Sequence, residues 1–146
     1  MITDRPVGVC SDHAGFALKE QVKTWLAERG FEVNDYGCHD TASCDYPDYA
    51  HPMGAALDNG ELAFGVAVCS TGNGISMTLN KHQSVRAALC WDVALAQFAR
   101  AHNDANVLVM PANFIAPALA SKVLDAYLNT EFEGGRHQRR VGKIAL

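Results

Sequence analysis

The chain has 146 residues, of which 49% are hydrophobic and 19% charged, and this composition fits one folded domain over residues 1–146 rather than a disordered chain. Its formal net charge of −4 argues against a nucleic-acid-binding domain, because such domains are normally basic. No apolar run approaches the roughly 20 residues that cross a bilayer, and residues 1–6 lack the pattern of a signal peptide. We therefore expect a cytoplasmic protein that binds neither nucleic acid nor membrane.

Short apolar runs alternate along the chain with segments of helical period. Strands are expected at residues 7–10, 31–36, 64–69, 85–90 and 106–110. Helices are expected at residues 16–29, 49–57, from about 74, from a cap at Asp92 to about 101, and at 114–128. This alternation predicts an α/β fold, a single doubly wound domain whose five-stranded parallel sheet carries helices on both faces.

The five cysteines are odd in number, so they cannot all form disulfides. Without a signal peptide, this indicates reduced thiols. The spacing of Cys38 and Cys44 with His39 and His51 does not match a standard zinc site. We expect no metal and no cofactor.

Ligands of open α/β sheets bind beyond the carboxyl ends of the strands. That rule selects residues 11–15, 70–76 and 111–113, together with the strand-end cysteines Cys10, Cys69 and Cys90. Nothing comparable to the loop at 70–76 follows Cys10 or Cys90, and we interpret these two as small buried hydrophobes.

The loop Ser70-Thr71-Gly72-Asn73-Gly74 is the most informative of these segments. Its two glycines let backbone amides converge on an anion at the start of a helix, although the same pattern also suits a tight turn that binds nothing. Cys69 stands directly before it. A thiol at a helix N-terminus has a lowered pKa and can act as a base, but a lone cysteine is also often a buried hydrophobe.

Two other polar clusters lie at predicted element ends, Asp12-His13 and His102-Asn103-Asp104. Histidine suits proton transfer near neutral pH, yet each of these residues also fits a helix cap or a surface position. His39, His51 and His82 lack such a setting and are interpreted as surface residues.

The C-terminal segment is basic, with Arg136, Arg139, Arg140 and Lys143 in the last eleven positions. If it is helical after Gly135, Arg136 and Arg140 share a face with His137 beside them and form a clamp for phosphate. Arg139 then points elsewhere and is structural. The alternative is a solvated basic tail.

Taken together, these segments resemble the type B ribose-5-phosphate isomerases, a family that includes the galactose-6-phosphate isomerase subunits. The matching stretches are SDHAGF at 11–16 followed by Leu18-Lys19, DYP at 45–47, CSTGNGIS at 69–76 followed by Asn80-Lys81, Arg86-Ala87, HNDANVL at 102–108, and EGGRH at 133–137 followed by Arg140. They follow the family's order and span most of the chain.

The resemblance implies a Rossmann-like sheet and metal-free aldose–ketose isomerisation of a sugar phosphate, most simply ribose 5-phosphate to ribulose 5-phosphate, through a cis-enediolate. It makes Cys69 the base. It assigns the binding of the enediolate oxygen to Thr71 and the following backbone amides of Gly72, Asn73 and Gly74. Some members have serine at the position of Cys69, and these carry glutamate at the position of Ile75. The apolar Ile75 therefore matches the members that use cysteine as the base.

The resemblance also assigns the rest of the site. Asp12 and His102 match positions for ring opening and hydroxyl binding, and Tyr46 and Asn103 line the site. The phosphate-binding positions are His13, Arg136 and Arg140, with His137 nearby. A homodimer, or a dimer of dimers, is implied, with active sites at the subunit interface and residues 130–146 packed there.

Two positions depart from the family pattern within the site. Ser70 stands where many members have glycine, and Asn113 stands where many have an arginine that adds to the phosphate site. The substrate could therefore be a tetrose or tetrulose 4-phosphate or a hexose 6-phosphate. Two other function classes stay open: a non-catalytic partner subunit that binds phosphosugar, and a flavodoxin-like nucleotide-binding domain, which the lack of a ribose-reading signature disfavours.

Overall fold

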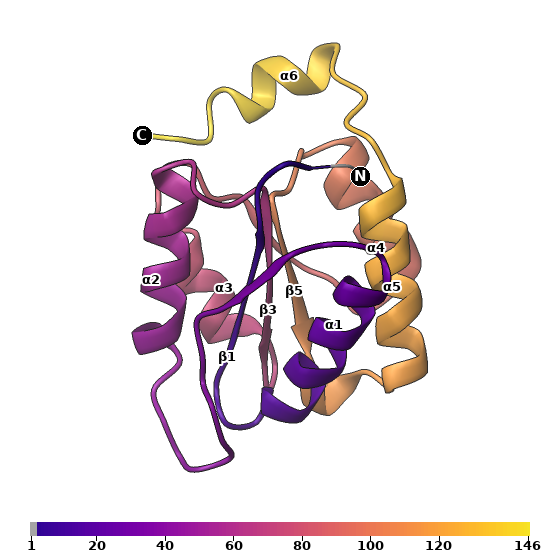
Figure 1. The fold of residues 1–146 in the computed structure, drawn as a ribbon. Coiled ribbons are helices and arrows are strands. Elements are labelled where there is room, and N and C mark those ends of the chain that lie inside the picture. The colour runs from indigo at the N-terminus through magenta and orange to yellow at the C-terminus, as the bar shows by residue number, and fades with distance from the viewer. Residues whose placement is uncertain (1–2) are drawn as a thin grey trace.

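The computed structural model describes residues 3–146, and its centre is a five-stranded parallel sheet in the order β2-β1-β3-β5-β4 (Figure 1). The strands are β1 (Val7–Ser11), β2 (Val33–Asp35), β3 (Phe64–Cys69), β4 (Ala87–Leu89) and β5 (Val107–Pro111). The three central strands β1, β3 and β5 are buried along their whole length, which explains their unbroken apolar sequences. The predicted α/β fold and parallel sheet are confirmed.

Helices cover both faces of this sheet. They are α1 (Phe16–Glu28), α2 (Pro47–Asp58), α3 (Asn73–Leu79), α4 (Val93–Ala101), α5 (Pro117–Asn129) and α6 (Arg136–Val141), with a 3-10 turn η1 at Ala112–Phe114. Helices α1, α4 and α5 pack on one face, and α2 and α3 on the other (Figure 1). Because strand side chains alternate between faces, Val68 joins the first core and Cys69 the second. Cys69 therefore faces the layer of α2 and α3.

The two edge strands are shorter than the sequence predicts. The strand expected at 31–36 is limited to Val33–Asp35, and the strand expected at 85–90 to Ala87–Leu89. Each pairs with a neighbour on one side only, so fewer of its residues join the ladder.

Helix starts follow the local chemistry of their first turns. The helix expected from residue 114 begins at Pro117, and α2 begins at Pro47, because the first turn of a helix leaves its N–H groups unpaired and tolerates proline. Asp92 caps α4 as predicted, and its carboxylate accepts a hydrogen bond from the Leu95 amide at 2.8 Å.

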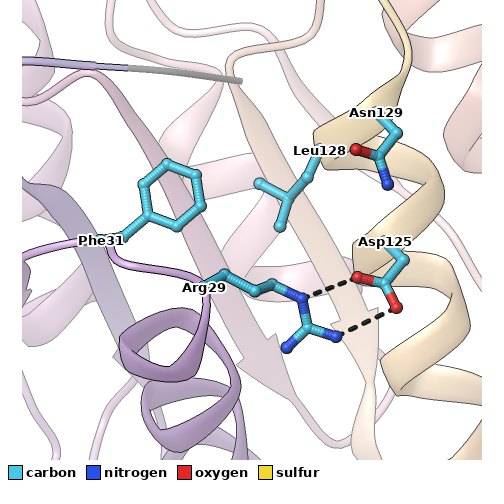
Figure 2. A pocket seen from close by; sticks show the side chains of 5 residues that line it. All are labelled: Arg29, Phe31, Asp125, Leu128 and Asn129. Carbon is cyan, nitrogen blue, oxygen red and sulfur yellow. Dashed lines mark hydrogen bonds and ion pairs between the residues drawn. The ribbon is translucent and has the colours of Figure 1, made fainter.

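A bidentate ion pair joins the end of α1 to α5. Arg29 donates to the Asp125 carboxylate from Nε at 2.7 Å and from Nη2 at 3.0 Å, beside a shallow pocket lined by Phe31, Leu128 and Asn129 (Figure 2). The two residues are 96 positions apart in the chain. The pair fixes the relative position of two helices on the same face of the sheet.

The strand order places a switch point between β1 and β3. From β1 the chain moves outward to β2 and then returns to the other side of β1 to form β3. The loops that follow β1 and β3 meet at the carboxyl edge, where ligands of such sheets bind. Helix α6 lies beyond the opposite, amino edge (Figure 1).

Candidate active site

Cys69 and Asp12 meet at the switch point between β1 and β3. The Cys69 thiol donates a hydrogen bond to Asp12 Oδ2 at 3.4 Å, and Asp12 Oδ1 accepts one from the Gly15 amide at 2.9 Å. Cys69 is 5% exposed and Asp12 6% exposed. A thiol and a carboxylate from positions 57 residues apart thus form a sheltered pair at the carboxyl edge.

The loop after Cys69 directs the backbone amides of Gly72 and Ile75 at the sulfur, in line with the convergent amides that its glycines predicted. Gly72 adopts a left-handed conformation with φ +80°, and a Cβ there would lie 2.4 Å from Leu89 Cδ1. A Cβ at Gly74 would lie 2.4 Å from Cζ of Tyr46, so the tyrosine ring forms a wall directly over the loop. The Thr71 hydroxyl accepts a hydrogen bond from the Asn73 amide at 3.2 Å.

The pKa of Cys69 is shifted in the direction opposite to the one that its place before a helix predicts. Burial raises the pKa of the thiol, and the negative charge of Asp12 raises it further, while the amides of Ile75 and Gly72 lower it without reversing the shift. The expectation of a lowered pKa is therefore wrong. The thiol is protonated at neutral pH, and it donates this proton in the hydrogen bond to Asp12 Oδ2.

We expect alkylation of Cys69 by iodoacetamide to be slow at pH 7 and to accelerate steadily toward higher pH. The raised pKa of Cys69 leaves only a small thiolate fraction at pH 7, and that fraction grows about tenfold for each pH unit below the pKa. Peptide mass spectrometry after timed alkylation measures this rate. In an Asp12→Asn variant the curve should move to lower pH, whereas an unmoved curve would show that Asp12 does not raise the pKa.

Asn113 binds Ser70, so the two departures from the family pattern touch each other. Asn113 Nδ2 donates to Ser70 Oγ at 2.6 Å, and the Asn113 amide donates to the Ser70 carbonyl at 3.1 Å. Ser70 directly follows Cys69, so this contact joins the loop after β3 to the turn after β5. Asn113 thus supports the Cys69 loop.

His13 also lies at the carboxyl edge, in the loop after β1. Its Nδ1 accepts a hydrogen bond from the Cys44 amide at 3.2 Å. The structure therefore gathers the predicted site residues of four loops, those after β1, β2, β3 and β5, at one edge: Asp12, His13, Tyr46, Cys69, Ser70, Thr71, Gly72, Asn73, Gly74 and Asn113.

The remaining predicted residues lie at the amino edge, around the end of α4 and the start of α6. The rings of His102 and His137 stack with centroids 4.3 Å apart and an angle of 12° between their planes. His102 Nε2 lies 3.9 Å from Glu133 Oε2. As predicted, α6 places Arg136 and Arg140 one turn apart, and both are exposed. Asn103 is exposed beside His102.

This amino-edge cluster combines a carboxylate, two histidines and the arginines of α6. Burial lowers the pKa of His137, and the charge of Arg136 lowers it further, so its ring is neutral near pH 7. His137 Nε2 is buried and has no hydrogen-bond partner among residues 3–146. His102, Glu133 and His137 offer ligand atoms within 4.8 Å of one another, but the guanidinium groups on α6 disfavour a metal cation there.

One chain does not bring the two groups together. Pro111 pairs with Cys69 at the carboxyl edge, whereas Asn106, just before β5, binds Gly65 at the amino edge. The length of β5 alone separates these edges by about 13 Å at 3.3 Å per residue. Within one chain, Cys69 and His102 lie at opposite ends of the sheet.

Two partners of the predicted histidines had no clear signal in the sequence. Glu133 pairs with His102, and Cys44 fixes His13, each from a separate segment. His82, interpreted as a surface residue, is instead mostly covered and joins His51 at 2.9 Å and Asp58 at 3.3 Å. These partners are too far apart in the chain for spacing to reveal them.

Residues 7–144 match the ribose/galactose isomerase family. The chain belongs to this family. The isomerase is 43% identical to ribose-5-phosphate isomerase B of Escherichia coli over 133 residues, which cover 91% of this chain and 89% of the relative. The fold matches the crystal structure of the Thermotoga maritima ribose 5-phosphate isomerase with a TM-score of 0.94 and 43% identity, over 98% of this chain and 99% of that one.

Another related structure holds a ligand. The Mycoplasma genitalium ribose-5-phosphate isomerase B, crystallised with ribulose 5-phosphate, is 36% identical with a TM-score of 0.93, over 98% of this chain and 95% of that one. Family membership makes the present chain an aldose–ketose isomerase, as the sequence motifs predicted. No helix within residues 3–146 is long and apolar enough to span a membrane.

Proposed function

We propose that this isomerase interconverts ribose 5-phosphate and ribulose 5-phosphate through a cis-enediolate, with Cys69 as the base. The pairing of the Cys69 thiol with Asp12, inside a loop of convergent amides, is the observation that carries the proposal. Enolisation requires a base beside the α-carbon and preorganised donors for the oxygen that gains negative charge. The relatives from Escherichia coli and Mycoplasma genitalium carry the name of this reaction.

The steps follow from the placement of these groups. Asp12 and His102 assist ring opening and bind sugar hydroxyls. The Cys69 thiolate, formed when its proton passes to Asp12 or to solvent, removes the proton from C2 of the open-chain aldose. Thr71 and the amides after it hold the oxygen at C1 as charge develops there. The Cys69 thiol then returns the proton to C1 while the proton of the C2 hydroxyl passes to the oxygen at C1, which yields the ketose with its carbonyl at C2.

The phosphate of the sugar binds away from the reacting carbons. We assign it to His13, Arg136 and Arg140, with His137 beside them, whose unpartnered Nε2 needs a polar ligand. Guanidinium groups bind phosphate oxygens in pairs, and binding energy at this remote group orients C1 and C2 for proton transfer.

The site requires a homodimer in this proposal, because its two halves lie at opposite edges of one sheet. A twofold axis near α4 would set the carboxyl edge of one protomer against the amino edge of the other. The surface beside α4 supports this, since Phe98 is 55% exposed and Phe114 71% exposed, and Trp91 is also half-exposed. Residues 130–146, which carry α6, would lie at this interface.

The contact between Asn113 and Ser70 supports a second candidate within the same reaction. Asn113 stands where many members of the family have a phosphate-binding arginine, and its side chain binds Ser70 instead. Phosphate binding in this proposal therefore depends on the groups of α6 and on His13. A shorter or longer sugar phosphate, a tetrose 4-phosphate or a hexose 6-phosphate, is then the competing substrate. The five free cysteines fit a reducing cytoplasm, where we place the enzyme.

An assay of the purified chain on aldose phosphates of four, five and six carbons tests this proposal. We expect ribose 5-phosphate to give a kcat/KM at least about tenfold above the others, because one methylene or hydroxyl alters transition-state binding by about that factor. A higher kcat/KM on the four- or six-carbon sugar phosphate would show that this sugar, and not the pentose phosphate, is the preferred substrate. Absence of turnover on all of them would favour a partner subunit.

A further inference from the structure

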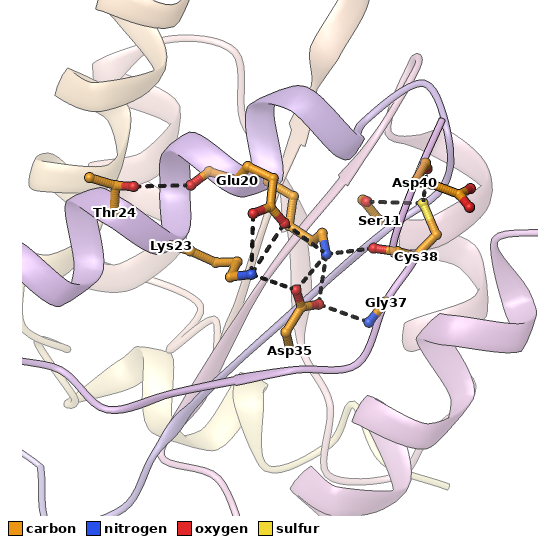
Figure 3. Close-up of polar contacts among 9 residues, drawn as sticks. Ser11, Glu20, Lys23, Thr24, Asp35, Gly37, Cys38 and Asp40 are labelled. Atoms are coloured by element: carbon orange, nitrogen blue, oxygen red, sulfur yellow. Dashed lines mark hydrogen bonds and ion pairs between the residues drawn. The ribbon is translucent and has the colours of Figure 1, made fainter. Parts of the chain in front are cut away.

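Lys19 is a charged side chain that the proposed reaction does not use, and it is completely buried. A buried ammonium group is tolerated only with a full set of partners. Lys19 Nζ donates to both carboxylate oxygens of Asp35 at 2.7 Å and to the carbonyl of Cys38 at 2.7 Å. Figure 3 shows Asp35 joined to Gly37, and Cys38 beside Ser11.

These partners anchor the start of the loop at residues 37–44. Asp35 Oδ1 accepts a hydrogen bond from the Gly37 amide at 2.9 Å. The Ser11 amide then donates to the Gly37 carbonyl at 2.7 Å, and the Cys38 amide donates to the Ser11 carbonyl at 2.9 Å. The loop is thus fixed to the last residue of β1, immediately before Asp12 and His13.

The far end of the same loop determines the state of His13. The Cys44 amide donates to His13 Nδ1 at 3.2 Å, and the Cys44 sulfur lies 3.8 Å from the same nitrogen. A ring nitrogen that accepts a hydrogen bond carries no proton, so neutral His13 holds its proton on Nε2. In this form His13 presents an N–H donor, which suits an anionic oxygen.

We propose that Lys19 is a positioning residue that, through Asp35 and the loop at 37–44, holds His13 in the Nε2–H form that donates to the sugar phosphate. The last step rests on the proposed function, which gives His13 to the phosphate. The first steps depend only on the contacts of Lys19, Asp35 and Cys44.

Lys23 provides a matched control on the same helix. It also donates to Asp35, at 2.9 Å, but its contacts are to Asp35 and Glu20 and its side chain is 33% exposed. Removing Lys23 weakens the ion pair while leaving the Lys19–Cys38 contact in place. A general effect of charge near Asp35 should therefore appear in both variants, and a positioning effect in Lys19→Met alone.

In Lys19→Met we expect KM for the sugar phosphate to rise about tenfold while kcat changes less than about threefold, because ground-state phosphate binding is weakened more than chemistry. In Lys23→Met both constants should stay within about twofold of the wild type. Long-range ¹H–¹⁵N spectra of the histidine rings give a second readout, in which His13 should change from one tautomer to a mixture in Lys19→Met only. Equal KM values in the two variants would overturn the proposal.

The wild-type spectrum tests the proposal even if Lys19→Met does not fold. His13 must then show the Nε2–H tautomer, and an Nδ1–H tautomer would overturn the inference. If the wild type turns over no sugar phosphate, the proposed function fails, while the tautomer comparison still decides whether Lys19 positions His13.

Discussion

Replacing Cys69 by alanine should lower kcat by about 10²- to 10⁴-fold, the range that a positioned acid–base group contributes to proton transfer. The variant keeps the amides that hold the enediolate and the groups assigned to the phosphate, so KM should change little. Steady-state kinetics on ribose 5-phosphate measure both constants, and thermal unfolding checks that the variant is folded. A loss in kcat without a loss in binding is the signature of a missing base.

Cys90 supplies the control for this experiment. It is also a buried cysteine at the carboxyl edge, but burial and Asp92 raise its pKa to about 12, and it lies outside the amide loop. Cys90→Ala should lose some stability through the small cavity it leaves and keep its kcat. If Cys69→Ala retained kcat within about twofold of the wild type, another group would have to be the base.

The sequence was sufficient to predict which residues of the candidate site meet at the carboxyl edge. Cys69 is the last residue of β3 and the loop at 70–74 follows it, while Asp12 directly follows β1. Topology alone therefore brings these residues to one edge of the sheet. The glycines at 72 and 74 predicted convergent amides. In the structure, a Cβ atom at either position would clash with a neighbouring side chain. Local pattern works here because each residue's position follows from the element that carries it.

The protonation state of Cys69 could not be predicted in this way. Its local setting before α3 favours a lowered pKa, but burial and the charge of Asp12 determine the result. Asp12 is distant in the chain, and burial depends on the layer of α2 and α3. The same limit applies to Lys19, whose partner Asp35 is met only once β2 lies beside β1.

The amino-edge half was predicted by residue type but not by place. His102 ends a helix that follows a strand, and such helices run back across the sheet, so the position after α4 belongs to the opposite edge from Cys69. The family resemblance, and not the predicted elements, grouped His102 and Arg136 with Cys69. The topology separates them within a chain, and this separation is the reason why the proposed function requires a dimer.

Mixed dimers provide the most decisive test of that division. We expect both a Cys69→Ala homodimer and an Arg136→Ala/Arg140→Ala homodimer to be nearly inactive, because each lacks one half of both sites. A heterodimer of the two, isolated with two different affinity tags, should recover about half of the wild-type activity. One of its two sites then combines an intact Cys69 with the intact arginines of the other protomer, and the second site carries all the substitutions.

A heterodimer of wild type with Cys69→Ala serves as the reference, since it also retains one intact site and should show about half activity whichever way the site is built. A site shared between two protomers and a site within one chain predict different activities only for the first heterodimer. If each site used residues of one chain, both protomers of that heterodimer would be defective and its activity would stay at the level of the homodimers. Recovery to the level of the reference therefore requires that Cys69 of one protomer acts with Arg136 and Arg140 of the other.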